Sequence, residues 1–407
     1  MKTTLPFAAL AAAMTLSAAA SAQTSQPPSQ PQSGQSMEER LAALEARLGA
    51  TTQVQFGGYI KLDGQVSRYT DGTRATALIG DDFFVPSTIP VGGDGGGVVT
   101  DFHAKESRFW LRSSTDTDYG VLGAYIEMDF LTQSMGDERI TNSYAPRIRH
   151  AYATFGDVLF GQTWSVFFDV AALPDLLDFV GPVGTTLVRQ AQVRYSPGQW
   201  DISLENPSST LYDTNNLIGN PGTLDDNRYP DLVVRYRVPM QRGSLSVAAV
   251  GRELAYRDGT SRESEYGYGV TVASKWMLGD TGNDIRAQLV GGKGVGRYMG
   301  LNAFRAGEIE ADGSVELIDT WSAMVAYRHL WSDQWRSSVA LSVAGADNPD
   351  TVAATTPKAY RTSHVNLIYS PAPRLDLGGE VIWGQRENED GERGEIGRVQ
   401  LSAKLAF

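Results

Sequence analysis

The stretch RVQLSAKLAF, residues 398–407, decides the fold class because its side chains alternate between apolar and polar. Successive side chains of a β-strand point to opposite faces of the sheet. This stretch therefore predicts a strand with one apolar and one water-facing side. The apolar series is Val399, Leu401, Ala403, Leu405 and Phe407, and the polar series is Arg398, Gln400, Ser402 and Lys404.

The same strand-and-turn pattern extends back to residue 52 and predicts sixteen strands. Short turns such as Pro197-Gly198 and Ser332-Asp333 alternate with long loops such as 69–104 and 207–228. Short turns on one side and long loops on the other are typical of outer-membrane barrels. We predict an all-β fold, a sixteen-stranded antiparallel transmembrane β-barrel over residues 52–407. The expected strands are 52–68, 105–116, 119–131, 145–156, 157–164, 187–197, 198–206, 229–239, 242–256, 264–278, 283–296, 315–331, 334–347, 357–371, 373–386 and 395–407.

Residues 1–22 read as a signal peptide. Lys2 begins this segment, an alanine-rich apolar stretch follows, and Ala20-Ser21-Ala22 forms a cleavage site. The rest of the chain has no run of about 18 apolar residues that could span a membrane as a helix. A membrane protein without such helices must close its strands into a barrel, because lipid offers no hydrogen bonds to open strand edges.

Two further segments precede the barrel. Gln, Ser and Pro dominate residues 23–35, which predicts a disordered linker. Over 36–49, Ser36 and Glu39 form a capping-box pattern that predicts a short periplasmic helix. Its apolar stripe leaves two alternatives open, a coiled coil with copies of itself or a lone helix that frays. The stripe consists of Met37, Leu41, Leu44 and Leu48.

Composition excludes several function classes. The net charge of −12 argues against a nucleic-acid partner, and the absence of cysteine excludes disulfides and cysteine metal sites. We predict no catalytic residues, no metal and no cofactor. Two of the four histidines have distinctive positions. His364 shares the water-facing side of its strand with Asn366, a weak hint of a hydrolase, and His150 falls on the outward side, where it would meet a neighbouring subunit.

The water-facing positions predict a positively biased lumen, with thirteen cations against seven acids. A narrow aqueous channel concentrates the field of its wall charges, and arginine binds carboxylates in a bidentate manner. We expect the cations to select anions, and the alternative is that they pair with lumen acids and stabilise the wall. The expected selecting residues are Lys61, Arg108, Arg112, Arg147, Arg149, Arg194, Arg235, Arg237 and Arg286, joined by Lys275, Arg328, Arg398 and Lys404. The acids are Asp63, Glu127, Asp129, Asp201, Glu205, Asp376 and Glu380.

Two long loops differ in character. Loop 165–186 is apolar, and we expect it to fold into the lumen as a constriction, with Asp169, Asp175 and Asp178 facing the arginines. The alternative is a contact between subunits, because large exposed apolar patches usually mark contacts. Loop 69–104 is rich in Asp and Gly without the spacing of a calcium site, and we expect it to be solvated.

Four short motifs, in this order, resemble those of the DcaP-like outer-membrane porins. They are GYIKLD at 58–63, SRF at 107–109, GQTWS at 161–165 and RQAQVRY at 189–195. The resemblance spans nearly all of 52–407 and the preceding helix. It implies a homotrimer in the bacterial outer membrane, in contact with lipid and lipopolysaccharide, with a periplasmic N-terminal coiled coil. It also implies passage of small anions such as dicarboxylates.

Passive diffusion of small hydrophilic solutes with a preference for anions is therefore the expected function. A structural or adhesion barrel is the first alternative, and an outer-membrane hydrolase is the second. A structural barrel would have a blocked lumen and no conductance. A hydrolase would need a nucleophile with a placed histidine or carboxylate partner.

Overall fold

The computed structural model describes residues 37–39, 52–72, 79–131, 141–220 and 222–407. The chain divides into two compact units, Met1–Gly49 and Ala50–Phe407, and the barrel lies in the second. The predicted signal peptide and linker lie outside the described residues, as does the predicted helix apart from its helical residues 37–39. No helix in the described part of the chain is both long enough and apolar enough to cross a membrane.

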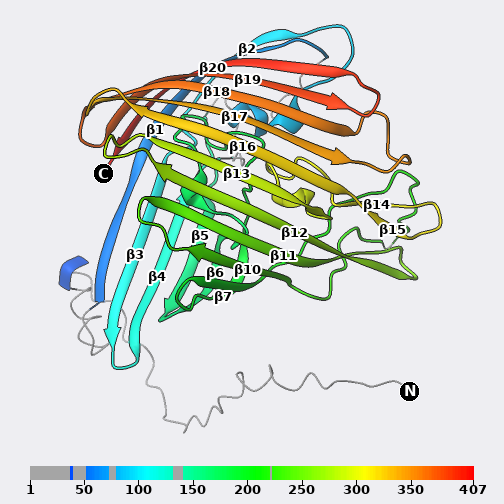
Figure 1. Ribbon diagram of the computed structural model, residues 1–407, viewed down its shortest axis with the longest axis horizontal. Coiled ribbons are helices and arrows are strands. Elements are labelled where there is room, and N and C mark those ends of the chain that lie inside the picture. The colour runs from blue at the N-terminus through cyan, green and yellow to red at the C-terminus, as the bar shows by residue number, and fades with distance from the viewer. Residues whose placement is uncertain (1–36, 40–51, 73–78, 132–140, 221) are drawn as a thin grey trace. The chain divides into compact units, whose positions relative to one another are not determined.

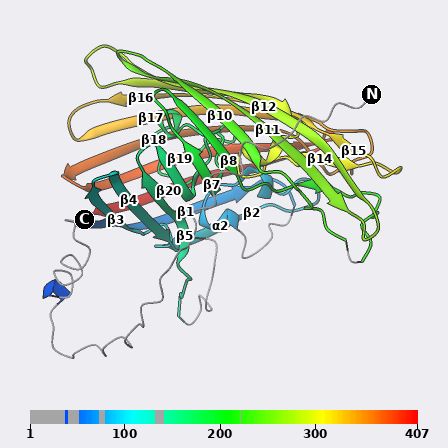
Figure 2. The same cartoon turned by 90° about the horizontal axis from the view of Figure 1, so that it is seen from below.

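The strands of the second unit form a closed antiparallel wall (Figures 1 and 2). Seventeen strands form one sheet, and because β2 and β3 share one position beside β1, the wall has sixteen positions. Pairing of β20 with β1 closes the ring. The predicted sixteen-stranded antiparallel barrel is confirmed. The wall strands are β1 (Thr52–Tyr69), β2 (Gly97–His103), β3 (Arg108–Thr117), β4 (Gly120–Asp129), β5 (Arg147–Phe155), β6 (Val158–Trp164), β7 (Arg189–Tyr195), β8 (Trp200–Glu205), β10 (Asp231–Val238), β11 (Gly243–Arg257), β12 (Arg262–Met277), β13 (Asp284–Lys293), β16 (Asp319–Leu330), β17 (Trp335–Asp347), β18 (Pro357–Ala372), β19 (Leu375–Asn388) and β20 (Arg393–Ala406).

Alternation along β20 separates the two faces of the wall. Leu401 is 64 % exposed on the outer face, whereas its neighbours Gln400 and Ser402 are 2 % and 7 % exposed on the inner face. Large tryptophans such as Trp276 and Trp331 lie exposed near strand ends, where an interfacial aromatic belt is expected. The outer face is therefore apolar and the inner face polar.

The second wall position departs from the predicted strand 105–116. β2 pairs with the C-terminal half of β1, and β3 pairs with its N-terminal half. Residues 104–107 lie between β2 and β3. A turn hydrogen bond of 3.0 Å from Ser107 N to Ala104 O interrupts the strand there. The interruption brings Glu106 against Lys61.

A second irregularity changes which residues of β5 face inward. The register between β4 and β5 shifts after Glu127, which opposes His150, while Met128 opposes Ile148. Arg149 is thus an extra residue on β5, and such a bulge breaks the strict alternation of faces. His150 consequently lies on the inner side, so the expectation that it faces outward was wrong.

Three connecting segments fold into the lumen. The first segment is residues 79–91 and contains α2 (Ile79–Asp82) and η1 (Pro86–Thr88). The second is residues 165–188 and contains η2 (Val170–Ala172). The third is residues 294–306 and contains η3 (Gly296–Tyr298). Their apolar side chains form clusters with one another and with inward side chains of the wall, because burial removes apolar surface from water. Phe84 and Ile89, for example, pack with Tyr69, Ile382 and Ile396.

Loop 69–104 is therefore not simply solvated, and that expectation was wrong for residues 79–91. Phe83 and Phe84 are 2 % and 1 % exposed. Arg398 Nη2 donates to Gly80 O at 2.7 Å and Arg386 Nη1 to Ser87 O at 3.1 Å, which fixes this segment to β19 and β20. Beyond the wall, a second small sheet joins β9 (Leu211–Tyr212), β14 (Gly307–Ile309) and β15 (Val315–Leu317) over an apolar cluster.

Candidate functional site

Loop 165–186 is fixed to the inner wall by its own backbone. Val166 N donates to Glu205 Oε1 at 2.8 Å, and Leu177 N donates to Glu380 Oε2 at 2.6 Å. These acceptors come from β8 and β19, strands well separated around the ring. The loop must therefore cross the lumen between them. Further backbone contacts join Asp175 to Asn366, Phe168 to Arg235, Leu173 to Arg286 and Gly184 to Ser342.

Of the three acids of this loop, one meets arginines. Asp175 accepts from Arg336 Nε at 2.9 Å and lies 3.7 Å from Arg328 Nη1. Asp169 instead accepts from Ser246 Oγ at 2.6 Å and from the N–H of Ala171, which caps η2.

Asp178 is placed differently from the expectation that it faces the arginines. Its carboxylate accepts from the N–H groups of Phe84, Val180 and Gly181 at 2.8, 3.1 and 2.8 Å. Burial raises the pKa of Asp178, although these hydrogen bonds oppose the shift. The carboxyl group joins loop 165–186 to segment 79–91.

A cavity of about 450 Å³ lies between this loop and the wall. Its aromatic and apolar lining includes Trp164 and Phe179. Five cations and five carboxylates also line it, so its formal charge is balanced. The cations are Lys61, Arg108, Arg149, Arg336 and Lys404, and the carboxylates are Glu106, Glu127, Asp175, Asp178 and Asp376.

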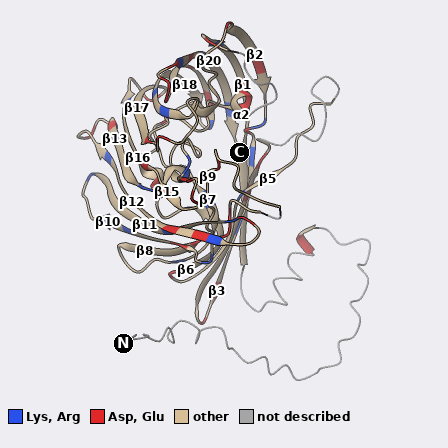
Figure 3. Cartoon of the chain, turned by 90° about the vertical axis from the view of Figure 1, so that its right-hand side faces the viewer, with Lys and Arg blue, Asp and Glu red and all other residues tan. Residues whose placement is uncertain are grey.

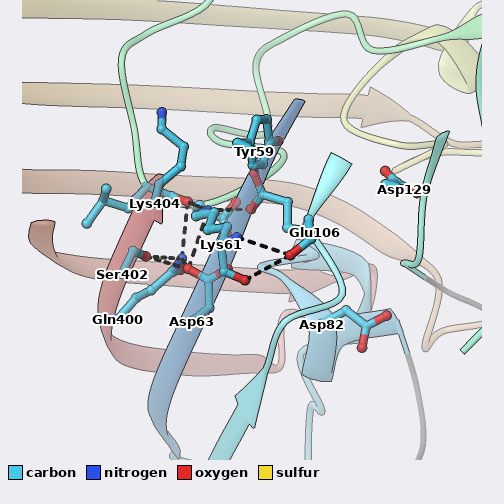
Figure 4. A network of polar contacts seen from close by, with 12 residues as sticks. Tyr59, Lys61, Asp63, Asp82, Glu106, Asp129, Gln400, Ser402 and Lys404 are labelled. Atoms are coloured by element: carbon cyan, nitrogen blue, oxygen red, sulfur yellow. Dashed lines mark hydrogen bonds and ion pairs between the residues drawn. The ribbon is translucent and has the colours of Figure 1, made fainter. Parts of the chain in front are cut away.

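A buried polar network around Lys61 forms one side of the cavity (Figure 4). Lys61 of β1 pairs with Glu106, lies 3.3 Å from Asp63, and donates to Leu177 O at 2.6 Å. Gln400 Nε2 of β20 donates to Asp63 at 2.9 Å. The first and last wall strands and the tip of loop 165–186 thus meet at one ammonium group.

Arginines concentrate on the adjacent strands β3 to β7, which carry six arginines, three carboxylates and no lysine. Arg108 lies 3.4 Å from Glu127, Arg147 2.7 Å from Asp129, and Arg149 contacts both acids at 2.6 and 3.0 Å. The six are Arg108, Arg112, Arg147, Arg149, Arg189 and Arg194, and the carboxylates are Asp116, Glu127 and Asp129. Basic and acidic side chains also occur along other wall strands (Figure 3).

The remaining predicted arginines lie further round the wall and are largely paired. Arg235 and Arg237 both contact Asp201, at 2.8 and 2.9 Å. Arg286 contacts Asp284 at 2.6 Å. The structure therefore brings Lys61, Arg108 and Arg149 together at the cavity. The cavity lining does not include Arg235, Arg237 and Arg286.

Aromatic rings accompany the arginines of β3 to β7. The guanidinium of Arg149 lies 4.9 Å from the Phe179 ring, and that of Arg189 lies 4.8 Å from the Trp164 ring. Arginine above an aromatic face is a favourable arrangement that leaves its outer edge able to bind an anion.

Several site residues were missed from the sequence. Arg336 of β17 and Asp284 of β13 lie at positions that the alternation of their strands directs inward. The alternating sequence pattern could therefore have identified both residues. Glu106 lies in the strand interruption and His150 in the bulge, and no alternation signal marks either. His150 Nδ1 is 2.9 Å from Thr163 Oγ1, and its ring lines the cavity.

The hydrolase hint has no support in the geometry. His364 is fully buried, its Nδ1 is 3.0 Å from Glu380 Oε1, and its ring packs edge-on against Phe84. Within the described residues, no three or more His, Asp or Glu side chains are grouped to hold a metal ion.

A closed sixteen-stranded wall with an apolar outside, a polar inside and a loop folded into the lumen defines an outer-membrane porin. The family model for the DcaP outer membrane protein matches residues 49–407. The chain belongs to the DcaP outer membrane protein family. It is an outer-membrane channel protein and not an enzyme.

Solved structures share the fold. The outer membrane channel DcaP of Acinetobacter baumannii superposes with a TM-score of 0.72 at 24 % identity, covering 88 % of this chain and 97 % of that one. A loop L8 deletion mutant of OmpT from Vibrio cholerae gives 0.51 at 12 % identity, with 88 % and 99 % covered. An anion-selective porin from Comamonas acidovorans gives 0.50 at 13 % identity, with 88 % and 100 % covered. No curated protein sequence matches the chain.

Proposed function

We propose that this channel lets small hydrophilic solutes diffuse passively and prefers anions, dicarboxylates among them. The observation that carries the proposal is the excess of arginine on β3 to β7, six against three carboxylates. The Phe179 ring of loop 165–186 packs against Arg147 and Arg149 of these strands, so a solute that passes this loop would come within reach of their field. The dicarboxylate preference is what the resemblance of the sequence motifs to the family implies, and the Comamonas porin of the same fold is named as anion-selective.

Reversal potentials in planar bilayers under a potassium chloride gradient test the anion preference. The expected potential has the sign of the chloride equilibrium potential. A reversal potential with the sign of the potassium equilibrium potential would overturn the proposal. A barrel that inserts into the bilayer without conducting ions would favour the structural alternative. Liposome swelling with a dicarboxylate salt and a size-matched neutral sugar tests the solute class. We expect faster swelling with the dicarboxylate.

We also propose a homotrimer whose subunits meet at β5 to β8, with lipid and lipopolysaccharide around the remaining wall. These four strands have only 9, 7, 7 and 6 residues, against 12 to 16 in β16 to β20. Their outward side chains include the small Ala151, Ala153 and Ala191, which allow two walls to approach closely. Native mass spectrometry of the detergent-extracted protein tests the trimer. Deletion of 36–49 tests whether the predicted coiled coil contributes to it.

A further inference from the structure

The six arginines of β3 to β7 differ in whether a carboxylate neutralises them. Arg108, Arg147 and Arg149 share Glu127 and Asp129. Within the described residues, no carboxylate oxygen lies within 4.0 Å of the remaining three guanidinium groups. Those three are Arg112, Arg189 and Arg194.

Arg189 packs against aromatic surface and keeps an unused donor. Its guanidinium lies over the ring of Trp164, which lines the cavity. Its Nη1 atom is buried without a hydrogen-bond partner. A buried donor without a partner is costly, and neither a carboxylate nor a hydrogen bond at Nη1 compensates this guanidinium group.

Arg194 is held by neutral acceptors only. Its Nε donates to Gln192 Oε1 at 3.0 Å and its Nη2 to the carbonyl of Trp164. Both hydrogen bonds orient the guanidinium group of Arg194. Because the two acceptors are neutral, its positive charge is not cancelled.

Two of the unpaired guanidinium groups meet at one residue. Arg189 lies over the Trp164 ring, and Arg194 Nη2 reaches the Trp164 carbonyl from a position five residues further along β7. Arg112 lies on β3, four residues nearer the periplasmic turn than Arg108. Arg189 and Arg194 therefore form one group beside Trp164, and β4, β5 and β6 separate the strand of Arg112 from theirs.

We propose that the three unpaired arginines form two binding places for carboxylate-bearing solutes, Arg189 with Arg194 beside Trp164 and Arg112 on β3. This inference rests on the proposed function and assigns its selectivity to particular residues. A paired arginine contributes little field at a distance, because its carboxylate cancels it. An unpaired one attracts an anion and can bind it through two donors.

The experiment measures the chloride-over-potassium permeability ratio of variants in planar bilayers. Each of R112Q, R189Q and R194Q is expected to lower the ratio roughly threefold, as loss of one unit charge near the ion path predicts. The triple Gln variant lowers it further, and the triple Lys variant keeps it near the wild-type value. The charge-neutral double variant R147Q/D129N is the matched control, and its ratio should stay within about twofold of wild type because it removes a cancelled pair.

The inference fails if the triple Gln variant keeps the wild-type ratio, or if R147Q/D129N lowers the ratio as much as the triple does. Heat-modifiable migration on gels checks that each variant is folded. If the triple variant does not fold, R112Q decides, since Arg112 is exposed and makes no ion pair within the described residues. A wild-type channel that prefers potassium would overturn the proposed function itself, and this outcome is distinct from the two above.

Discussion

Lys61 Nζ of β1 donates a 2.6 Å hydrogen bond to the backbone carbonyl of Leu177 at the tip of loop 165–186. The same ammonium group pairs with Glu106 and lies near Asp63. One buried cation therefore contacts two carboxylates and fixes loop 165–186 to the wall.

Lys61→Met should destabilise the barrel strongly. Removing one partner of a buried ion pair leaves the other charge uncompensated and typically costs about 3–5 kcal/mol. Urea unfolding in detergent micelles, followed by tryptophan fluorescence, measures the change. Arg242→Gln is the control, because the pair of Arg242 with Asp280 is exposed and should contribute almost nothing. Equal midpoints for Lys61→Met and wild type would contradict the structural role.

Replacing Arg108 and Arg147 together by alanine should lower the preference for anions. The double variant leaves Glu127 and Asp129 with Arg149 as their remaining close arginine, so the local charge changes from positive to negative. Reversal potentials under a salt gradient measure the change. We expect the permeability ratio to fall by about tenfold, the equivalent of about 1.4 kcal/mol. An unchanged reversal potential would show that these strands do not face the ion path.

Stability should depend on pH through Asp178. Burial raises the pKa of this carboxyl group above its ordinary value. A group with a higher pKa in the folded state binds its proton preferentially there, so its contribution is most favourable at acidic pH and falls as pH rises through the raised pKa. Relative to Asp178→Asn, the wild-type urea midpoint should therefore rise as pH is lowered from about 7 to about 4.

Asp258 provides a control of opposite sign. Hydrogen bonds from the backbone N–H groups of Ser261 and Thr260, and then from their hydroxyls, lower the pKa of Asp258 in an exposed turn. Its stabilisation is present above the ordinary aspartate pKa and is lost as pH falls. The urea midpoint of the wild type relative to Asp258→Asn should therefore fall as pH is lowered. If the relative midpoints for Asp178 and Asp258 changed in the same direction, the opposite pKa shifts of the two carboxyl groups would be contradicted.

Gly161→Ala should weaken the hairpin of β5 and β6. Gly161 has a φ of +128°, and an added Cβ would lie 2.3 Å from Ala151 O. Backbone strain of this kind costs about 1–3 kcal/mol. The urea midpoint measures the loss, with Gly397→Ala as control because its Cβ would meet open space. A larger loss in the control would refute the steric explanation.

Alternation and turn spacing were sufficient to predict the wall. The positions that failed are those where tertiary contacts change the local pattern. Bulging at Arg149 turns His150 inward, and a turn at Ser107 breaks the second strand, yet neither has a distinct signature in one sequence. The inward path of residues 79–91 depends on partners such as Ile382 and Ile396, which lie about 300 positions away in the chain. Pairing of the arginines depends on the same long-range register, so the unpaired ones could be identified only from the structure.

Closure of the ring has a consequence for how the protein is made. Tyr59 of β1 pairs with Ala406 of β20, so the last seam forms only when both ends of a long polypeptide are present together. Contacts between residues so distant in the chain make folding slow. Until these contacts form, the edges of β1 and β20 lack hydrogen-bond partners and can pair with other chains. Newly exported molecules should consequently need a holding chaperone during transit, and a variant that loosens this seam should lose yield in cells before it loses conductance.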